Sequence, residues 1–241
     1  MKTLMVLRAG DVPPPIAARR GEYMGWIRRE VGGAWAGAWA EHDVRGEAPL
    51  PSLEGISGFV LTGSSHSVTE RAPWMRRYEA FLRRVMAEEV PVFGICFGHQ
   101  ILAQAMGGLV EKNPLGREIG TRRARRTGQE DPILEGLPDE FEVNTTHVDS
   151  VTRLPEGARV LLSTRLESYA AYALGDRARA VQFHPEIDGD AMRGWVEVRA
   201  PILRKEGLDP EALHASATDA PHGARMLRNF VETIVHPRTQ Y

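Results

Sequence analysis

One cysteine, Cys96, lies between two glycines at the end of an apolar run, in the segment PVFGICFGHQ (91–100). Gly94 and Gly98 stand two residues before and after it, a spacing typical of a nucleophile on a tight strand-to-helix turn. A thiol at a helix N-terminus is exposed to the positive end of the helix dipole, which lowers its pKa and favours the thiolate. The segment therefore predicts a nucleophilic cysteine, and the alternative is a buried structural one.

A cysteine nucleophile needs a base, and the base needs a group that orients it. The segment AVQFHPEI (180–187) supplies both, since His184 follows an apolar run and Glu186 comes two residues later. Side chains two residues apart in extended chain lie on the same side, and Pro185 stiffens the backbone between them. We expect His184 to exchange protons with Cys96 and the leaving group, and Glu186 to fix the tautomer of His184. The alternative for any single histidine is a surface or core position.

These residues must be positioned by a sheet, and the chain alternates short β-rich runs with helical segments. We predict an α/β fold with a mostly parallel central sheet flanked by helices on both faces. Trp35 and Trp39, four residues apart, predict a helical stripe used for packing. The expected strands are 2–7, 57–63, 90–95, 141–147, 158–163, 168–174 and 178–183, and the expected helices are 16–31, 74–89, 98–106, 188–206 and 221–235.

Composition limits the classes of protein that the chain can represent. Its 241 residues, 42% hydrophobic and 26% charged, suffice for one α/β core, so we expect a single domain over 1–241 with a helical C-terminal tail at about 188–241. A formal net charge of −2 gives no general attraction to nucleic acid or to a membrane. The apolar run at the start is too short for a signal peptide, and a lone cysteine forms no internal disulfide, so we expect a cytoplasmic protein.

No cofactor or metal site is expected. The sequence contains neither a Gly-x-x-x-x-Gly-Lys nor a Gly-x-Gly-x-x-Gly segment, and no zinc-binding pattern. The chemistry is therefore expected to rest on the side chains and backbone of the chain itself.

The segments GICFGHQILAQAMGG and VQFHPE together resemble the class I (triad) glutamine amidotransferase family, of the stand-alone, GMP-synthase-like type. The resemblance extends from about Val60 to Glu186. It implies a flavodoxin-like three-layer sandwich with Cys96, His184 and Glu186 as the catalytic triad. In that family the cysteine attacks the side-chain amide of glutamine, ammonia leaves a γ-glutamyl thioester, and water releases glutamate.

The same resemblance suggests roles for further residues. An oxyanion hole would be formed by the N–H of Phe97 and by a second N–H in the turn LTGSSHS, from either Gly63 or Ser64, where Ser64 replaces the second glycine of the family's Gly-Gly-Pro. Gln100 is similar to the residue that contacts the glutamine substrate. The segment that resembles the family's His-x-Asp-x-Val pattern, whose backbone helps to hold the amino acid end of the substrate, comprises His147, Asp149, Ser150 and Val151.

The resemblance leaves several functions open. The partner would be glutamine or another γ-glutamyl small molecule, and a separate synthetase could accept the ammonia. Alternatively, the protein would resemble γ-glutamyl peptidases, which cleave other γ-glutamyl compounds. A further alternative is a non-catalytic regulatory protein that has kept the fold. In the tail, Trp195, Val198, Ile202 and Leu203 recur at helical spacing, which predicts either an extended core or a docking surface for a synthetase.

Overall fold

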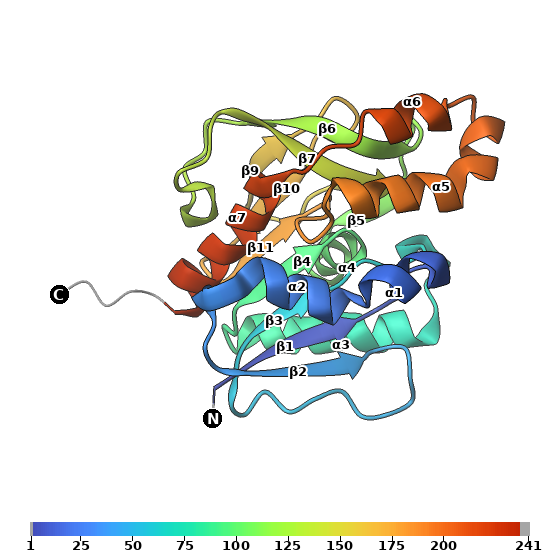
Figure 1. Ribbon diagram of the computed structural model, residues 1–241. Helices are drawn as coiled ribbons and strands as arrows, with labels where there is room; N and C mark the ends of the chain where they lie inside the picture. The colour runs from blue at the N-terminus through green and yellow to red at the C-terminus, as the bar shows by residue number, and fades with distance from the viewer. Residues whose placement is uncertain (1, 237–241) are drawn as a thin grey trace.

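A nine-stranded sheet runs through the molecule, and its two halves differ in strand direction (Figure 1). The computed structural model describes residues 2–236. The strand order is β2-β1-β3-β4-β11-β10-β9-β6-β7; the strands from β2 to β11 pair in parallel, and the remaining pairings are antiparallel. The strands are β1 (Thr3–Arg8), β2 (Ala38–Asp43), β3 (Ile56–Leu61), β4 (Val92–Ile95), β6 (Glu118–Arg126), β7 (Glu140–His147), β9 (Ala158–Ser163), β10 (Ala171–Leu174) and β11 (Ala178–Val181). A separate antiparallel pair consists of β5 (Leu109–Lys112) and β8 (Asp149–Arg153).

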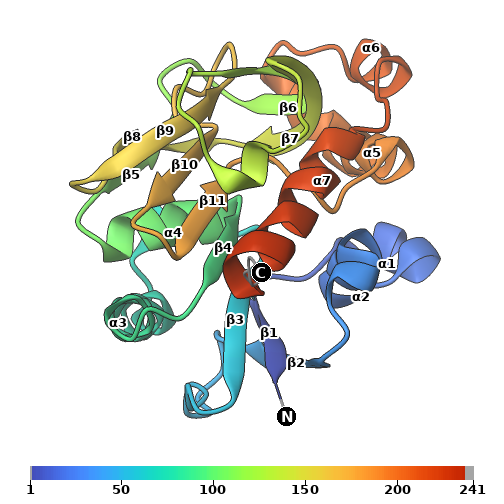
Figure 2. The same ribbon diagram turned by 90° about the vertical axis from the view of Figure 1, so that its left-hand side faces the viewer.

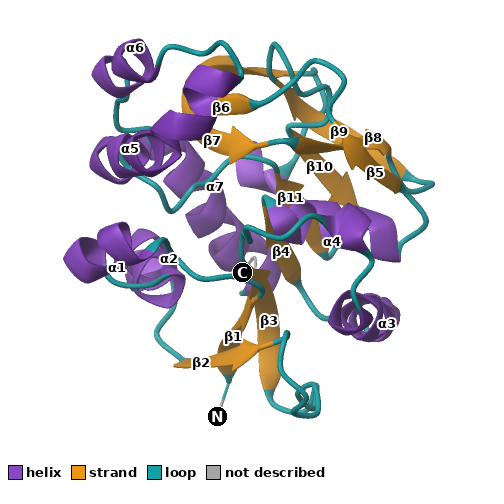
Figure 3. Cartoon of the chain, turned by 90° about the vertical axis from the view of Figure 1, so that its right-hand side faces the viewer, coloured by secondary structure: helices purple, strands orange, loops and turns teal. Residues whose placement is uncertain are grey.

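Helices cover both faces of this sheet (Figures 2 and 3). On one side lie α3 (Pro73–Ala87) and α4 (Phe97–Ala105), whose apolar residues form one core cluster. The other side carries α1 (Pro14–Arg20), α2 (Tyr23–Val31), α5 (Gly189–Lys205), α6 (Pro210–Ala215), α7 (Pro221–Phe230) and a π-helix (Val231–Val235), which enclose a second cluster. The central strands β4 and β11 are buried at every residue, as expected for strands covered on both faces. The prediction of an α/β sheet flanked by helices is therefore confirmed.

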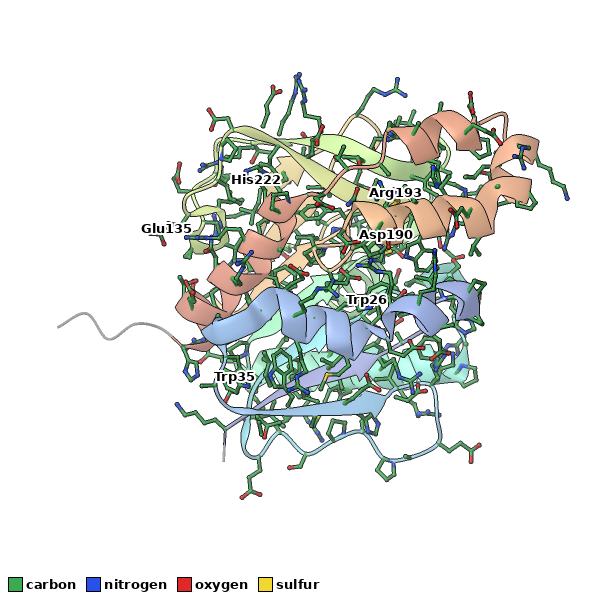
Figure 4. All side chains as sticks on the ribbon, viewed as in Figure 1. Trp26, Trp35, Glu135, Asp190, Arg193 and His222 are labelled. Atoms are coloured by element: carbon green, nitrogen blue, oxygen red, sulfur yellow. The ribbon has the colours of Figure 1, made fainter. Side chains whose placement is uncertain are left out.

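The first helical region differs from the prediction for 16–31. The structure has two helices there, and α1 begins at Pro14 because proline is well tolerated in the first helical turn. The chain leaves α1 at Gly21, which has a φ of 80° that favours glycine. The indole N–H of the buried Trp26, labelled in Figure 4, donates to the carbonyl of Arg20 at 2.7 Å and ties α2 to the end of α1.

The predicted helical stripe of Trp35 and Trp39 is wrong. Trp35 has extended backbone after a short 3-10 turn, and Trp39 lies in the edge strand β2, which pairs in parallel with β1. Trp35 still serves packing, since its ring stacks on His236 at 4.7 Å and its indole N–H donates to Ala38 at 2.9 Å. Four-residue spacing alone did not distinguish this strand from a helix.

The C-terminal helices pack back onto the sheet. The N-terminus of α5 is capped by Asp188, whose carboxylate accepts from the N–H of Ala191 at 2.8 Å. Trp195 and Leu203 are buried, as the extended-core alternative requires, whereas Val198 and Ile202 are 42% and 41% exposed, so that alternative is wrong for these two residues. Within residues 2–236, no helix is both long and apolar enough to span a membrane.

Candidate active site

Cys96 occupies the turn between β4 and α4. Its φ of 50° and ψ of −103° are unusual for a residue other than glycine, and such strain is concentrated at functional sites. The turn is held by two backbone bonds: the N–H of Cys96 donates to Val181 at 2.9 Å, and its carbonyl accepts from Gln100 at 3.1 Å. Cys96 therefore stands at the N-terminus of α4, as the sequence predicts.

The flanking glycines permit a close approach of chain segments. A Cβ atom at Gly98 would lie 2.6 Å from the carbonyl oxygen of Leu61 in β3, and one at Gly94 would lie 2.7 Å from the carbonyl oxygen of Gly98. Neither position has space for a side chain unless the backbone moves. The two glycines thus allow α4 to start directly against β3, which fixes the position of Cys96.

His184 reaches the same place from the neighbouring strand. Because β11 is parallel to β4, with Val181 opposite Ile95, the segment after β11 emerges beside the turn at Cys96. The backbone N–H of His184 donates to the carbonyl of Asn144 at 2.8 Å. A Cβ atom at Gly63 would lie 2.9 Å from Cε1 of His184 and 3.7 Å from Cβ of Cys96. Gly63, His184 and Cys96 are therefore neighbours in the structure.

Glu186 orients the imidazole. Its Oε1 lies 2.7 Å from Nδ1 of His184, and both side chains are buried. Since Nδ1 is engaged by the carboxylate, Nε2 is the ring nitrogen left for the thiol. The structure therefore brings together Cys96, His184 and Glu186, the residues that the sequence predicts as nucleophile, base and orienting carboxylate.

The charges of this group shift its pKa values in a direction suited to nucleophilic chemistry. Burial favours the neutral thiol, but the charge of the neighbouring His184 outweighs that effect and holds the pKa of Cys96 below its ordinary value. Burial disfavours the charged imidazole, yet Glu186 and Cys96 raise the pKa of His184 to about 10. The arrangement favours a thiolate and imidazolium pair at neutral pH.

Two backbone segments offer N–H groups beside the thiol. Phe97 is the first residue of α4, a position whose N–H has no partner within the helix. Ser64 lies in the turn after β3, where its hydroxyl donates to the carbonyl of Ala9 at 2.8 Å and accepts from the N–H of His66 at 3.1 Å. Phe97, Ser64 and Cys96 line one pocket, whereas Gly63 packs behind it against His184.

The residues predicted to contact the substrate separate into two groups. Gln100, His147 and Asp149 line the same pocket as Cys96. Ser150 and Val151 are buried in β8, where Val151 pairs with Val110 and belongs to the apolar core. Their side chains are therefore not part of the pocket wall.

Hydrogen bonds tie this wall together. The amide of Gln100 donates to the carbonyl of Asp149 at 2.8 Å and to Oε1 of Gln182 at 3.0 Å. The carboxylate of Asp149 accepts from the hydroxyl of Ser67, so it is linked to the segment that follows β3. The wall is held in place before any ligand binds.

The buried pair that the pocket-lining His147 forms with Glu118 was not foreseen from the sequence. Nε2 of His147 lies 3.2 Å from a carboxylate oxygen of Glu118, and Nδ1 lies 2.9 Å from the carbonyl of Asp149. Burial disfavours the imidazolium, but the hydrogen bond to Glu118 raises the pKa of His147 overall. Glu118 is the first residue of β6, whose later residues are largely basic, and it carries no local signal. Only the pairing of β6 with β7, which places Glu118 opposite His147, reveals it.

A further part of the pocket wall was also missed. Arg117, Arg199 and Ile202 line the pocket together with Cys96. Arg117 precedes β6, and the other two stand three residues apart on α5, a spacing that places them on one helix face. Their separation from Cys96 in the sequence concealed this relationship. Within residues 2–236, no group of three or more His, Cys, Asp or Glu side chains could hold a metal ion.

Comparison with known proteins identifies the family that this fold and site define. The family model "Glutamine amidotransferase class-I" matches residues 40–194, which is more than half of the chain. The chain therefore belongs to the class I glutamine amidotransferase family.

Two relatives illustrate its range. The GMP synthase [glutamine-hydrolyzing] of Thermosipho africanus is 39% identical over 133 residues, which cover 54% of this chain and 24% of the synthase. Gamma-glutamyl peptidase 4 of Arabidopsis thaliana is 31% identical over 154 residues, which cover 62% of this chain and 61% of that protein. The match thus spans about a quarter of this synthase and over half of this peptidase.

Solved structures extend the similarity over nearly the whole chain. A glutamine amidotransferase from Thermotoga maritima has a TM-score of 0.77 at 24% identity and covers 98% of both chains, a likeness in fold. A glutamine amido transferase from Methylobacillus flagellatus has a TM-score of 0.68 at 25% identity and covers 98% of this chain and 92% of its own. The C-terminal helices are thus included in the shared fold.

Proposed function

We propose that the protein hydrolyses a γ-glutamyl amide through a thioester on Cys96. The observation that carries this proposal is the position of His184, which adjoins Cys96 and is bound at 2.7 Å by the carboxylate of Glu186. Membership of the class I glutamine amidotransferase family supports it.

The first half of the reaction would form the thioester. The Cys96 thiolate attacks the γ-carbonyl carbon, and the negative charge passes to the carbonyl oxygen. The N–H groups of Phe97 and Ser64 would bind that oxygen; Ser64 is preferred to Gly63 because it lines the pocket. The carbon–nitrogen bond then breaks as the imidazolium of His184 gives its proton to the departing amine.

The second half would release glutamate. Neutral His184 takes a proton from water, and the resulting hydroxide attacks the thioester carbonyl. The carbon–sulfur bond breaks, glutamate leaves, and the thiolate faces the imidazolium again. Glu186 holds the imidazole in the same orientation throughout, because its bond to Nδ1 is not needed by either proton transfer.

The amino acid end of the substrate would be held by Gln100 and the backbone at 147–151. Gln100, His147 and Asp149 line the pocket, and their hydrogen bonds to one another fix the wall. Ser150 and Val151 would contribute only through the position of their backbone in β8.

Two versions of this activity remain to be separated by experiment. In one, the substrate is glutamine and the ammonia passes to a separate synthetase, as the similarity to a GMP synthase suggests. In the other, the protein is a γ-glutamyl peptidase, and the similarity to gamma-glutamyl peptidase 4 supports this version. A non-catalytic regulatory role is less favoured, because Cys96, His184 and Glu186 are all retained at the pocket.

We further propose that the chain works as one domain in a reducing compartment such as the cytoplasm. The C-terminal helices share the core of the sheet, with Trp195, Met226 and Phe230 buried, which favours an extended core over a docking surface. The mechanism requires the thiol of Cys96 to stay reduced.

The test is steady-state release of glutamate by the purified chain alone, from glutamine and from a γ-glutamyl dipeptide. Release that is lost in Cys96→Ser supports the proposal, because a serine hydroxyl is a far weaker nucleophile at neutral pH. Silence toward both substrates, with activity restored by a co-purifying protein, would reject the stand-alone hydrolase in favour of an amidotransferase subunit.

A further inference from the structure

Two guanidinium groups stand in the wall of the pocket that contains Cys96. Arg117 comes from the segment before β6, and Arg199 comes from α5, accompanied by Ile202 one turn further along the helix. These residues belong to other elements than Gln100 and Asp149, which are proposed to hold the amino acid end of the substrate. The pocket thus has a second, cationic part, which binding of the amino acid end of the substrate does not explain.

The two arginines differ in how their charges are balanced. Arg117 makes two hydrogen bonds to the carboxylate of Glu206, at 2.7 and 3.0 Å, so its charge is compensated within the protein. Arg199 is half-buried and lies over the ring of Trp195 at 4.9 Å, but it makes no hydrogen bond or ion pair to any other residue within 2–236. A guanidinium has five N–H donors, and those of Arg199 are not engaged by an acceptor of the chain.

The surroundings of Arg199 favour an anionic ligand. Burial lowers the pKa of its guanidinium and repulsion by Arg117 adds to that effect, while Cys96, Tyr23 and Glu206 offset only part of it. A carboxylate placed beside Arg199 would counter the cost of that partly buried charge and bind through paired hydrogen bonds.

We propose that Arg199 binds a carboxylate on the amine portion of the substrate, so that the preferred substrates are γ-glutamyl amino acids rather than glutamine. This inference rests on the proposed hydrolysis of γ-glutamyl amides and names the substrate class for it. The glutamyl portion carries its own carboxylate in every substrate. The test must therefore distinguish binding of that carboxylate from binding of the carboxylate on the amine portion.

The experiment compares kcat/KM for three substrates that share the glutamyl portion. γ-Glutamylglycine carries a carboxylate on its amine portion, whereas γ-glutamylmethylamide and glutamine do not. The parent protein is expected to prefer γ-glutamylglycine, and Arg199→Gln should lower kcat/KM for it by about 10- to 100-fold, the range for a hydrogen bond to a charged group. Its effect on the other two substrates should be below about threefold by the same reasoning.

Two further variants separate binding from structure. Arg199→Lys keeps the charge and should retain part of the preference, although it loses the planar fork. Arg204→Gln removes an arginine from the same helix whose side chain is 57% exposed and pairs with Glu211, so it should change none of the three rates. Unchanged thermal unfolding of Arg199→Gln would show that the fold is intact. Because Arg199 also interacts electrostatically with Cys96, the rates on γ-glutamylmethylamide and glutamine report any effect of the lost charge on the thiol.

Three outcomes would overturn the inference. Equal losses on all three substrates would mean that Arg199 binds the glutamyl carboxylate or supports the fold. A parent protein that is active but has no preference for γ-glutamylglycine would reject the substrate class while leaving the hydrolase intact. A parent protein inactive toward all three would reject the proposed function and this inference with it.

Discussion

Nδ1 of His184 lies 2.7 Å from Oε1 of Glu186, and both side chains are buried beside Cys96. The carboxylate raises the pKa of His184 and leaves Nε2 to face the thiol. This relationship determines both the orientation of the imidazole and its charge.

Glu186→Gln should lower kcat by up to about 10⁴-fold, the loss seen when the orienting carboxylate of a triad is replaced by an amide. The amide can hold the ring in the wrong tautomer and no longer stabilises the imidazolium. The measurement is steady-state glutamate release, with circular dichroism to verify folding. A rate within about threefold of the parent would remove Glu186 from the mechanism, since a lost charged hydrogen bond costs more than that.

The pH dependence of alkylation should reveal the effect of His184 on the thiol. In the parent protein, the rate with iodoacetamide should rise through a pKa below the ordinary value for cysteine, because the charge of His184 stabilises the thiolate. In His184→Ala, burial and the charge of Glu186 raise the pKa of Cys96 and only His147 opposes them, so the midpoint should move above the ordinary value. Identical midpoints in the two proteins would contradict the ion pair.

The rate of glutamate release should also decrease at alkaline pH. The leaving amine needs a proton from the imidazolium of His184, whose pKa is raised to about 10. Because the protonated form is lost as the pH rises through that value, kcat/KM, which reports the free enzyme, should fall on the alkaline side and depend little on the protonation of His184 near neutrality. A decrease centred near the ordinary pKa of histidine would show that the pKa of His184 is not raised.

Gly98→Ala should destabilise the fold by about 1–3 kcal/mol, the usual cost of overpacking. The new Cβ atom would lie 2.6 Å from the carbonyl oxygen of Leu61, so α4 must shift and carry Cys96 with it. Gly25→Ala in α2 is the matched control, since no atom lies within 4 Å of its added Cβ. That control should stabilise by about 0.5–1 kcal/mol, because alanine favours a helix interior. The free energy of unfolding of both variants is measured by denaturant titration. Equal stability of the two variants would refute the close-contact argument.

The chemistry of the site was more predictable than its surroundings. Cys96, with its flanking glycines, and the pair His184 and Glu186 are local patterns, because the nucleophile turn and the orienting carboxylate depend on residues two positions apart. The parallel pairing of β4 with β11 makes these two segments adjacent, but β5 to β10 separate the two strands along the chain, so this pairing is seen only in the structure.

The rest depended on contacts between distant segments. Val198 and Ile202 fit a helical apolar stripe, yet the side of α5 that carries them is partly exposed, and Ile202 borders the pocket instead of the core. Trp39 lies in an edge strand whose parallel pairing with β1 no local spacing indicates. Arg199 reaches the pocket only because α5 packs back over the sheet. Hydrophobic periodicity indicates which side of a helix or strand is apolar, but it does not indicate what that side contacts.

The most direct test of the central claim is covalent labelling by a glutamine analogue that carries a diazo-ketone in place of the side-chain amide. We predict one label per chain, located at Cys96 by peptide mass analysis, with loss of glutamate release in proportion to labelling. In His184→Ala the labelling should be slowed by at least about 10-fold, because the thiolate is no longer stabilised. Labelling at another residue, or equal rates in the two proteins, would contradict a nucleophile at Cys96 activated by His184.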